Sequence, residues 1–176
     1  MPSNESVKRN LKLIQDDPSK VLGLTVGKKH MPKPGDYIPR ADAQSAPSIS
    51  YAGLDSSRSY IVVCLDIDAP FRSFDVLGPI LHWIQPGFAA AQGSAELNST
   101  APFVVDYIGP APPPGAAPHR YCFFLYEQPA GFDGKQYAPP NGQKMSNWSR
   151  MRCSLDAWEK KLGLGAVVAV NYFTSN

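Results

Sequence analysis

The sequence has little of what identifies several specialised classes of protein. It contains 3 cysteines in 176 residues, too few and too far apart for a disulfide framework or a zinc site. Its formal net charge is +2 and its basic residues are scattered, so nucleic acid is not an expected partner. No run approaches ~20 apolar residues, and no apolar stretch follows the first charges. We therefore expect neither a membrane span nor a secretory signal, and we expect a cytoplasmic protein.

The common enzyme signatures are missing as well. The sequence has no GxSxG, P-loop, GxGxxG, HExxH or CxxC motif. Its aspartates and histidines are residue types that metals accept as ligands, but no compact metal-binding loop holds them together. The sequence consequently predicts no metal ion and no other cofactor.

Proline and glycine, by contrast, are abundant. The chain has 18 prolines and 14 glycines, which interrupt it too often for a helix bundle and favour short strands joined by turns. A hydrophobic fraction of 43% and a charged fraction of 18% describe an ordinary globular protein. We expect a mainly β fold in one domain over residues 1–176, with the helical segment 1–20 packed on it.

Runs of β-branched residues and the glycine and proline positions predict the strands. The strongest signal covers residues 60–68, which are apolar on both faces and should lie centrally in a sheet. A second strand is expected at 80–85, closed by Pro86 and Gly87. Further strands are expected at 103–108, 119–126 and 166–173.

Two helices and a turn are expected outside the sheet. Residues 4–14 have the apolar spacing of a helix that Ser3 or Asn4 can cap, and Asp17-Pro18 predicts a further helical turn. Residues 154–162 predict a helix capped by Ser154 and stopped by Gly163.

Polar side chains gather at the ends of the predicted strands. Asp66 and Asp68 are two positions apart in one strand, so both point to the same face. His82 lies within an apolar strand, and His119 and Tyr121 share one face of another. A purely structural interpretation is available for each: an aspartate can cap a turn, and a single histidine can pack in a core.

A pocket is the alternative interpretation. The strand ends border connections rich in glycine and proline, and rigid backbone at such ends can line a cleft. We expect Asp66 to orient an imidazole, because Asp–His pairing is the commonest use of this arrangement. Arg120 falls on the opposite face from His119, where it can hold a loop by binding a carboxylate.

The order and spacing of three motifs resemble the phosphatidylethanolamine-binding protein family. The motifs are Asp66-Ile-Asp68-Ala-Pro70, then Leu81-His82-Trp83, then the loop rich in proline and glycine that leads into His119-Arg120-Tyr121. The C-terminal helix and strand also look like this family, and residues 77–87 look like its fungal members. The resemblance runs from about residue 20 to the end.

The resemblance implies a β-sandwich of antiparallel sheets with a few short peripheral helices. It also implies a small pocket for phosphate-like or acetate-like anions and for phospholipid head groups. It places these residues in the pocket: Asp66, Asp68, Pro70, His82, Pro112, His119 and Tyr121. A cis Ala69–Pro70 bond is typical of the family.

Two departures from the family bear on access to this pocket. Ala111 stands where a glycine is common, which can reorient an amide donor or narrow the mouth. The sequence ends soon after Phe173, before the helix that covers the pocket in animal members. We therefore expect wider access, or cover from the N-terminal segment.

The resemblance implies two functions that need the same pocket. The first is a protein that binds a small anion or a phospholipid head group, contacts a membrane peripherally, or regulates a kinase or protease. The second is an enzyme that assists coupling of maleic-anhydride-type monomers in a fungal maleidride pathway. Its catalytic residues would be His82, His119 and Asp66. A hydrolase that uses the same cluster has less support.

Overall fold

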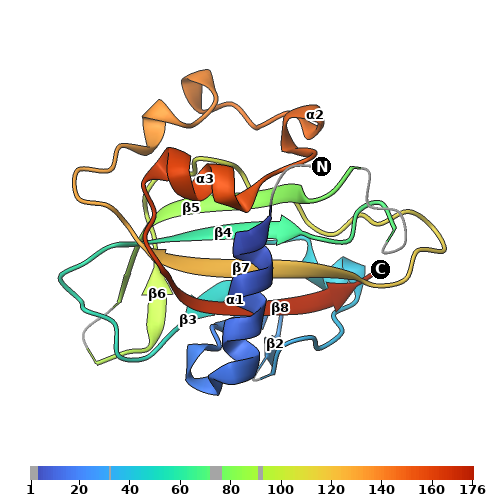
Figure 1. Ribbon diagram of the computed structural model, residues 1–176, viewed down its shortest axis with the longest axis horizontal. Helices are drawn as coiled ribbons and strands as arrows, with labels where there is room; N and C mark the ends of the chain where they lie inside the picture. Colours follow the sequence, from blue (N-terminus) through green and yellow to red (C-terminus); the bar gives the residue numbers. More distant parts are fainter. Residues whose placement is uncertain (1–3, 32, 72–76, 91–92) are drawn as a thin grey trace.

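The computed structural model in Figure 1 is a curled antiparallel sheet with helices packed on its outer face. The structure describes residues 4–31, 33–71, 77–90 and 93–176. The strands lie in the order β2-β1-β3-β6-β5-β4-β7-β8. Their bounds are β1 Gly23–Val26, β2 Lys29–Met31, β3 Ser48–Ser50, β4 Tyr60–Asp66, β5 Ile80–Ala90, β6 Glu96–Asn98, β7 His119–Glu127 and β8 Val167–Ser175.

The helices are short and peripheral. Their bounds are α1 Glu5–Asp16, α2 Asn147–Arg150 and α3 Leu155–Leu162, with single 3-10 turns at Pro18–Lys20, Arg40–Ala43, Gly134–Gln136 and Pro140–Gly142. None of the helices in the described part of the chain is long and apolar enough to cross a membrane. The predicted mainly β, antiparallel fold with a few short helices is confirmed, although the expected two sheets are one continuous curled sheet.

The curl of the sheet creates an inner and an outer apolar core. In β4, Val62 and Cys64 belong to the inner core, whereas Ile61 and Val63 belong to the outer core. Helices α1 and α3 cover the outer face, as Figure 1 shows. Because both faces of β4 are buried, its apolar residues are continuous, and the predicted central position between β5 and β7 is confirmed.

Strand β5 continues through Pro86 and Gly87, where the sequence predicted its end. Tyr60 pairs with Phe88 and Val62 pairs with Gln85, so residues 86–87 together oppose a single residue of β4. This arrangement is a β-bulge, which frees the proline from the ladder and accommodates Gly87 at φ 76°. The prediction was wrong because proline followed by glycine occurs in bulges as well as in turns.

Residues 103–108 are extended but form no strand of their own. Val105 makes an isolated bridge to Ile84, with hydrogen bonds of 3.0 and 3.1 Å. Farther along, the Ile108 amide donates to the His82 carbonyl at 3.0 Å. The segment therefore follows the side of β5 at separate points, and the predicted third strand was wrong.

Helices α1 and α3 cap one another. The Asn4 side-chain oxygen accepts from the Leu155 amide at 2.9 Å, at the start of α3. Asp156 in turn accepts from the amides of Glu5 and Ser6 at 3.0 and 2.8 Å, at the start of α1. Asn4 makes no capping bond to its own helix. The expected local cap was wrong because the side chain satisfies amides of another helix.

The other helix signals behave as the sequence predicted. Ser154 accepts from the Ala157 amide at 3.1 Å, and Gly163 ends α3 in the left-handed conformation at φ 68°. Asp17 accepts from the Ser19 amide and starts the 3-10 turn. Ser3, the other proposed cap of α1, lies outside the described residues.

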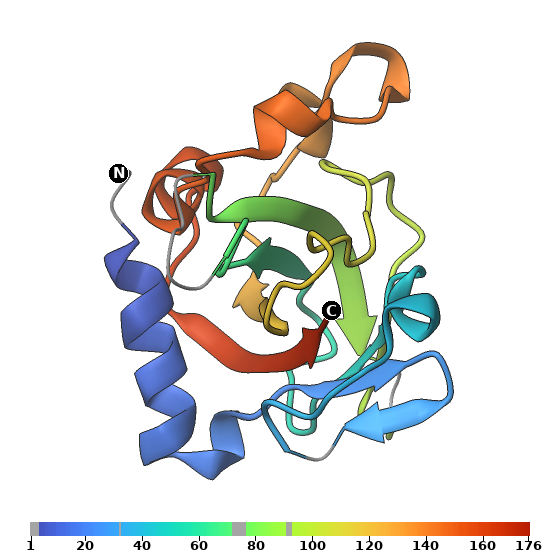
Figure 2. The same ribbon diagram turned by 90° about the vertical axis from the view of Figure 1, so that its right-hand side faces the viewer.

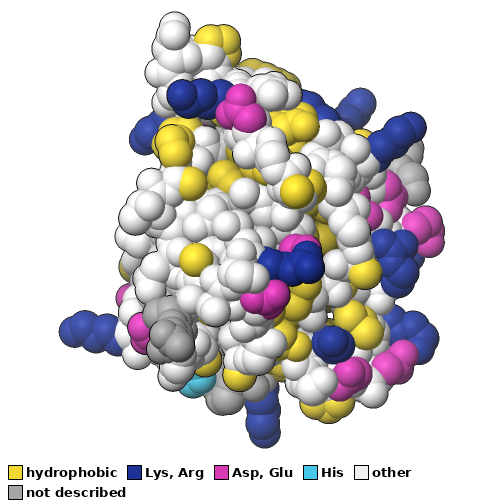
Figure 3. All heavy atoms as spheres, turned by 90° about the vertical axis from the view of Figure 1, so that its left-hand side faces the viewer, with side chains coloured by type: hydrophobic (Ala, Val, Ile, Leu, Met, Phe, Trp, Pro, Cys, Tyr) yellow, Lys and Arg dark blue, Asp and Glu magenta, His cyan; other side chains and the backbone are white. Residues whose placement is uncertain are grey.

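Charged side chains of both signs are interspersed over the face shown in Figure 3. In exposed ion pairs such as Arg58 with Asp55 and Lys12 with Asp16, each positive side chain lies next to a negative one. Such a surface has no concentrated basic face of the kind that tracks a phosphate backbone.

Candidate functional site

A cavity of about 270 Å³ opens at one end of the sheet, the end that Figure 2 faces. We call it the Asp/His pocket. Five of the seven residues predicted to bind ligand line it: Asp66, Pro70, His82, Pro112 and His119. Asp68 and Tyr121 lie outside its lining. The structure thus brings five of the seven residues together in one cavity, and the role of all seven toward a ligand stays a prediction.

A bulge in β5 positions His82. Cys64 of β4 pairs with Trp83 and Leu65 pairs with Leu81, so His82 has no opposite residue in β4. Leu81 packs in the outer core and Trp83 in the inner core. The extra residue between them turns toward β7, where its ring meets the Tyr121 ring edge-on at 5.0 Å. Bulges commonly re-aim side chains beside functional sites.

The His82 ring is neutral and has one nitrogen open to the pocket. Its Nδ1 lies 2.7 Å from the Ile108 carbonyl oxygen, which only accepts, so Nδ1 carries the hydrogen. Burial lowers the pKa of His82, and this effect outweighs the Asp66 charge that raises it. Nε2 therefore presents a lone pair, and no residue in the described part of the chain hydrogen-bonds to it.

His119 is held as an imidazolium. Its Nδ1 lies 2.8 Å from Asp66 Oδ2, and its Nε2 lies 3.1 Å from the Pro70 carbonyl oxygen. Both partners accept, so both ring nitrogens must donate. Burial alone lowers the pKa of His119, but the hydrogen bond and charge of Asp66 overcome it and raise the pKa. The expected Asp–His pair is present, and it leaves His119 no free nitrogen.

Asp68 forms a separate ion pair behind the pocket. Its Oδ2 accepts from Nε of Arg120 at 2.9 Å and from the Arg120 amide at 2.9 Å, and its Oδ1 accepts from Nη2 at 2.7 Å. This fork geometry is the strong form of the carboxylate–guanidinium contact. The interpretation of Arg120 as a residue that holds a loop by binding a carboxylate agrees with this geometry.

Tyr121 supports the pocket from within the core. Its ring stacks on Phe173 at 5.2 Å, and its hydroxyl is buried close to the Ala111 backbone. Burial raises the pKa of Tyr121, so the hydroxyl stays protonated. Tyr121 therefore packs against the pocket residue His82, whose ring it meets edge-on.

Arg150 is a pocket residue that the sequence did not reveal. It is 1% exposed, and its Nη2 donates to Asp106 Oδ1 at 2.5 Å. Its Nη1 donates to the carbonyls of Asp106 and Leu81 at 3.0 and 3.2 Å. The guanidinium thereby joins α2, β5 and the extended segment that carries Ile108. No local signal could have found this pair, because Asp106 and Arg150 are far apart in sequence.

The fixed charges of the site cancel in pairs. Each of the three buried carboxylates has its own cation: Asp66 with His119, Asp68 with Arg120, and Asp106 with Arg150. No group of three acidic, histidine or cysteine side chains in the described residues could hold a metal ion. The groups left to bind a ligand in the pocket are therefore Nε2 of His82 and the surrounding backbone. The Ala69–Pro70 bond is cis, as predicted.

Sequence comparison identifies relatives over most of the chain. A family model described as phosphatidylethanolamine-binding protein matches residues 28–173. Carboxypeptidase Y inhibitor from Saccharomyces cerevisiae is 23% identical, over 89% of this chain and 84% of the relative. Phomoidride biosynthesis cluster protein N from Talaromyces stipitatus is 29% identical, over 86% of this chain and 82% of the relative.

Solved structures share the fold. Carboxypeptidase Y inhibitor, in the crystal structure of its complex with the cognate proteinase, matches with a TM-score of 0.75 at 24% identity, over 98% of this chain and 93% of that one. The phosphatidylethanolamine-binding protein from Plasmodium vivax matches with a TM-score of 0.65 at 19% identity, over 99% and 98%. With its three motifs, its curled sheet and a family model that spans most of its length, the chain belongs to the phosphatidylethanolamine-binding protein family.

Proposed function

We propose that the protein binds a small anion, such as a phosphate or carboxylate head group, in the Asp/His pocket. One observation carries the proposal: Nε2 of His82 is an open ring nitrogen in a pocket whose other charged groups are paired. A pair of carboxylates would repel an anion if they were uncompensated. Here His119 and Arg120 neutralise Asp66 and Asp68, so this repulsion is largely removed.

Binding should be coupled to one proton. The neutral His82 offers a lone pair, which repels a fully deprotonated oxygen and attracts an O–H or N–H donor. An anion can bind after His82 takes up a proton, or it can bring that proton as an acidic hydroxyl or an ammonium group. Phosphate monoesters and carboxylic acids both meet this requirement.

The size of the pocket limits the ligand. Its volume of about 270 Å³ lies just under the ~300–1,000 Å³ of sites for drug-sized molecules. A head group or a short acid fits this volume, and any long acyl chain has to remain outside. The ligand class is thus defined by a small acidic group.

Titration calorimetry with inorganic phosphate and with phosphoethanolamine tests this proposal. We expect His82→Gln to weaken binding by at least about tenfold, since it removes the titrating nitrogen. His30→Gln is the matched control, because His30 is exposed on β2 and lies outside the pocket. His82→Ala should likewise abolish binding with little loss of folding. Unchanged phosphate affinity in the His82 variants would contradict the proposal.

A second candidate is an enzyme that couples maleic-anhydride-type monomers. The 29% identity to phomoidride biosynthesis cluster protein N supports it, together with a neutral His82 that can accept a proton. His82 would act as the base, and the Asp66–His119 pair would position the backbone around it. Mass spectrometry of such monomers incubated with the protein and with His82→Gln would detect His82-dependent coupling. Equal product without protein would exclude it.

Regulation of a protease is compatible with the same pocket. The similarity to carboxypeptidase Y inhibitor supports it, and Trp148 is 82% exposed on α2, beside the pocket residue Asn147. Exposed tryptophans are frequent anchors at protein interfaces. An inhibition assay with carboxypeptidase Y should show inhibition that Trp148→Ala weakens. Full protease activity at saturating protein would exclude this partner.

A further inference from the structure

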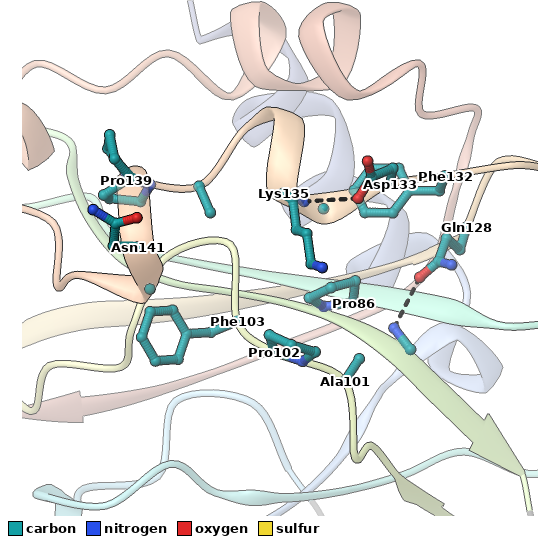
Figure 4. Close-up of a pocket in the computed structure, with 15 residues that line it drawn as sticks. Pro86, Ala101, Pro102, Phe103, Gln128, Phe132, Asp133, Lys135, Pro139 and Asn141 are labelled. Atoms are coloured by element: carbon teal, nitrogen blue, oxygen red, sulfur yellow. Dashed lines mark hydrogen bonds between the residues drawn. The ribbon is translucent and has the colours of Figure 1, made fainter.

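A second, larger cavity lies beside the other bulge of β5. It has a volume of about 580 Å³ and lies between Pro86 and the loop of residues 130–142. We call it the apolar groove. Figure 4 shows its walls, in which Phe103 and Pro139 face Pro86 and Phe132 across the opening. Its volume falls within the ~300–1,000 Å³ of small-molecule sites.

The floor of the apolar groove is preformed. The Gly87 amide donates to the Gln128 side-chain oxygen at 2.8 Å, which joins the bulge to the end of β7. Phe132 stacks on Tyr137 at 5.5 Å, with their rings 16° from parallel. A ligand that enters therefore finds aromatic and proline surfaces already in place, which limits the entropy cost of binding.

Lys135 gives the groove an uncompensated positive charge. Its side chain extends toward Pro86 in Figure 4, and it forms no ion pair with any residue that the structure describes. Asp133 is close in sequence, but its Oδ1 accepts from the Lys135 backbone amide at 3.1 Å and caps the 3-10 turn. In Figure 4 that carboxylate lies beside the backbone, away from the Lys135 ammonium.

We propose that the apolar groove binds an amphipathic carboxylate, namely an aromatic or short aliphatic acid. The apolar body would lie against the Phe103 ring, and the carboxylate would meet the Lys135 ammonium, which Figure 4 shows beside Pro86. A neutral apolar molecule would leave the ammonium without a partner. A purely polar anion would gain nothing from the proline and phenylalanine walls.

This site is independent of the Asp/His pocket. The two cavities share no lining residue, and they lie at opposite ends of β5. Gly87 and Gly134 line the apolar groove, whereas Gly109 lines the Asp/His pocket. The amide signals of these glycines can therefore report separately on occupation of each cavity.

Titration with 1-naphthoate, followed by amide NMR and fluorescence, tests the proposal. We expect shifts at Gly87 and Gly134 and a preference of about tenfold over 1-naphthalenemethanol, the neutral analogue. Lys135→Met should remove that preference and leave the affinity for the alcohol within about twofold. Phe103→Ala should weaken both compounds. Lys144→Met is the control, because Lys144 is an exposed neighbour outside the groove and should have no effect.

Each contrary result is decisive. Equal affinity for acid and alcohol, or a preference that survives Lys135→Met, would overturn the carboxylate assignment. Shifts confined to Gly109, or no shift at all, would overturn the site itself. Because phosphate binding to the Asp/His pocket is measured separately with His82 variants, the two proposals fail independently.

Discussion

The two bulges of β5 produce two different kinds of cavity from one strand. The bulge at His82 turns a titratable side chain into a small pocket in which every carboxylate is paired. The bulge at Pro86 and Gly87 places backbone and a proline ring under a larger cavity with an unpaired lysine at its edge. The same backbone irregularity thus places a titratable side chain in one cavity and forms part of the wall of the other.

The comparison predicts that the two cavities respond to different conditions. The Asp/His pocket gains charge only when a proton enters with the ligand, so its affinity should follow pH. The apolar groove exposes its lysine charge to solvent, so its affinity for an anion should follow ionic strength.

Arg150→Met should remove the framework of the Asp/His pocket. It leaves the Asp106 carboxylate buried without its cation, which costs about 3–5 kcal/mol in comparable buried pairs. Urea denaturation measures this loss. Arg58→Met, which breaks exposed ion pairs, should cost no more than about 1 kcal/mol. Equal losses in the two variants would show that Arg150 is not a framework residue.

Gly87→Ala should damage the apolar groove and spare the Asp/His pocket. The new Cβ would lie 2.6 Å from the Ala101 Cβ at a φ of 76°, so we expect a loss of about 1–3 kcal/mol. Gly53→Ala is the control, because Gly53 has a similar φ of 79° and open space around it. Gly53→Ala should therefore lower the free energy of unfolding by less than Gly87→Ala does. The affinity of the Asp/His pocket for phosphate should be unchanged in both variants. A changed phosphate affinity would mean that the two cavities along β5 are coupled.

The affinity of the Asp/His pocket for acetate should fall by about tenfold per pH unit between about pH 7 and about pH 8. This fall corresponds to a loss of about 1.4 kcal/mol of binding free energy per pH unit. The pKa of free His82 is lowered by burial, so the ring is neutral in this range and must take up a proton when acetate binds. Calorimetry in buffers of different ionisation enthalpy counts that proton. Naphthoate binding to the apolar groove should stay constant over the same range. A flat acetate profile would exclude His82 as the anion partner.

His119→Gln should produce the smallest effect, a change in how stability depends on pH. The pKa of His119 is raised in the folded state, so the wild-type pair stabilises fully below about pH 6.5 and loses that contribution as pH rises through the raised pKa. Unlike methionine at position 150, glutamine keeps an N–H group that can donate to Asp66, so only the charge is lost and we expect a cost of about 1 kcal/mol below about pH 6.5. Denaturation at several pH values should show the stability difference narrowing as pH rises. A constant difference would mean that the pKa of His119 is not raised in the folded state.

Local signals explain the parts of the fold that sequence predicted. The residues of β4 are β-branched and apolar on both faces, which is sufficient to place the strand centrally. Ser154 and Gly163 mark the ends of α3 through bonds within a few residues. The Asp66–His119 pair was expected as a type of interaction because both residues lie at strand ends.

The rest depends on partners distant in sequence. Whether Pro86 ends a strand or forms a bulge is decided by pairing with β4, and sequence near Pro86 does not contain that information. The Arg150–Asp106 pair and the docking of Asn4 on α3 join residues that only the completed fold brings together. The apolar groove was not predicted for the same reason: residues 130–142 form a wall only after they fold over β5.

The mutual capping of α1 and α3 has a consequence for the nascent chain. Asp156 supplies the oxygens for the first amides of α1, yet a ribosome makes it about 150 residues later. At typical rates of synthesis, about 5–20 residues per second, the first helix waits on the order of ten seconds for its cap. During that interval its apolar face also lacks β8. Helix α1 therefore completes its first turn only after α3 has been made, late in synthesis.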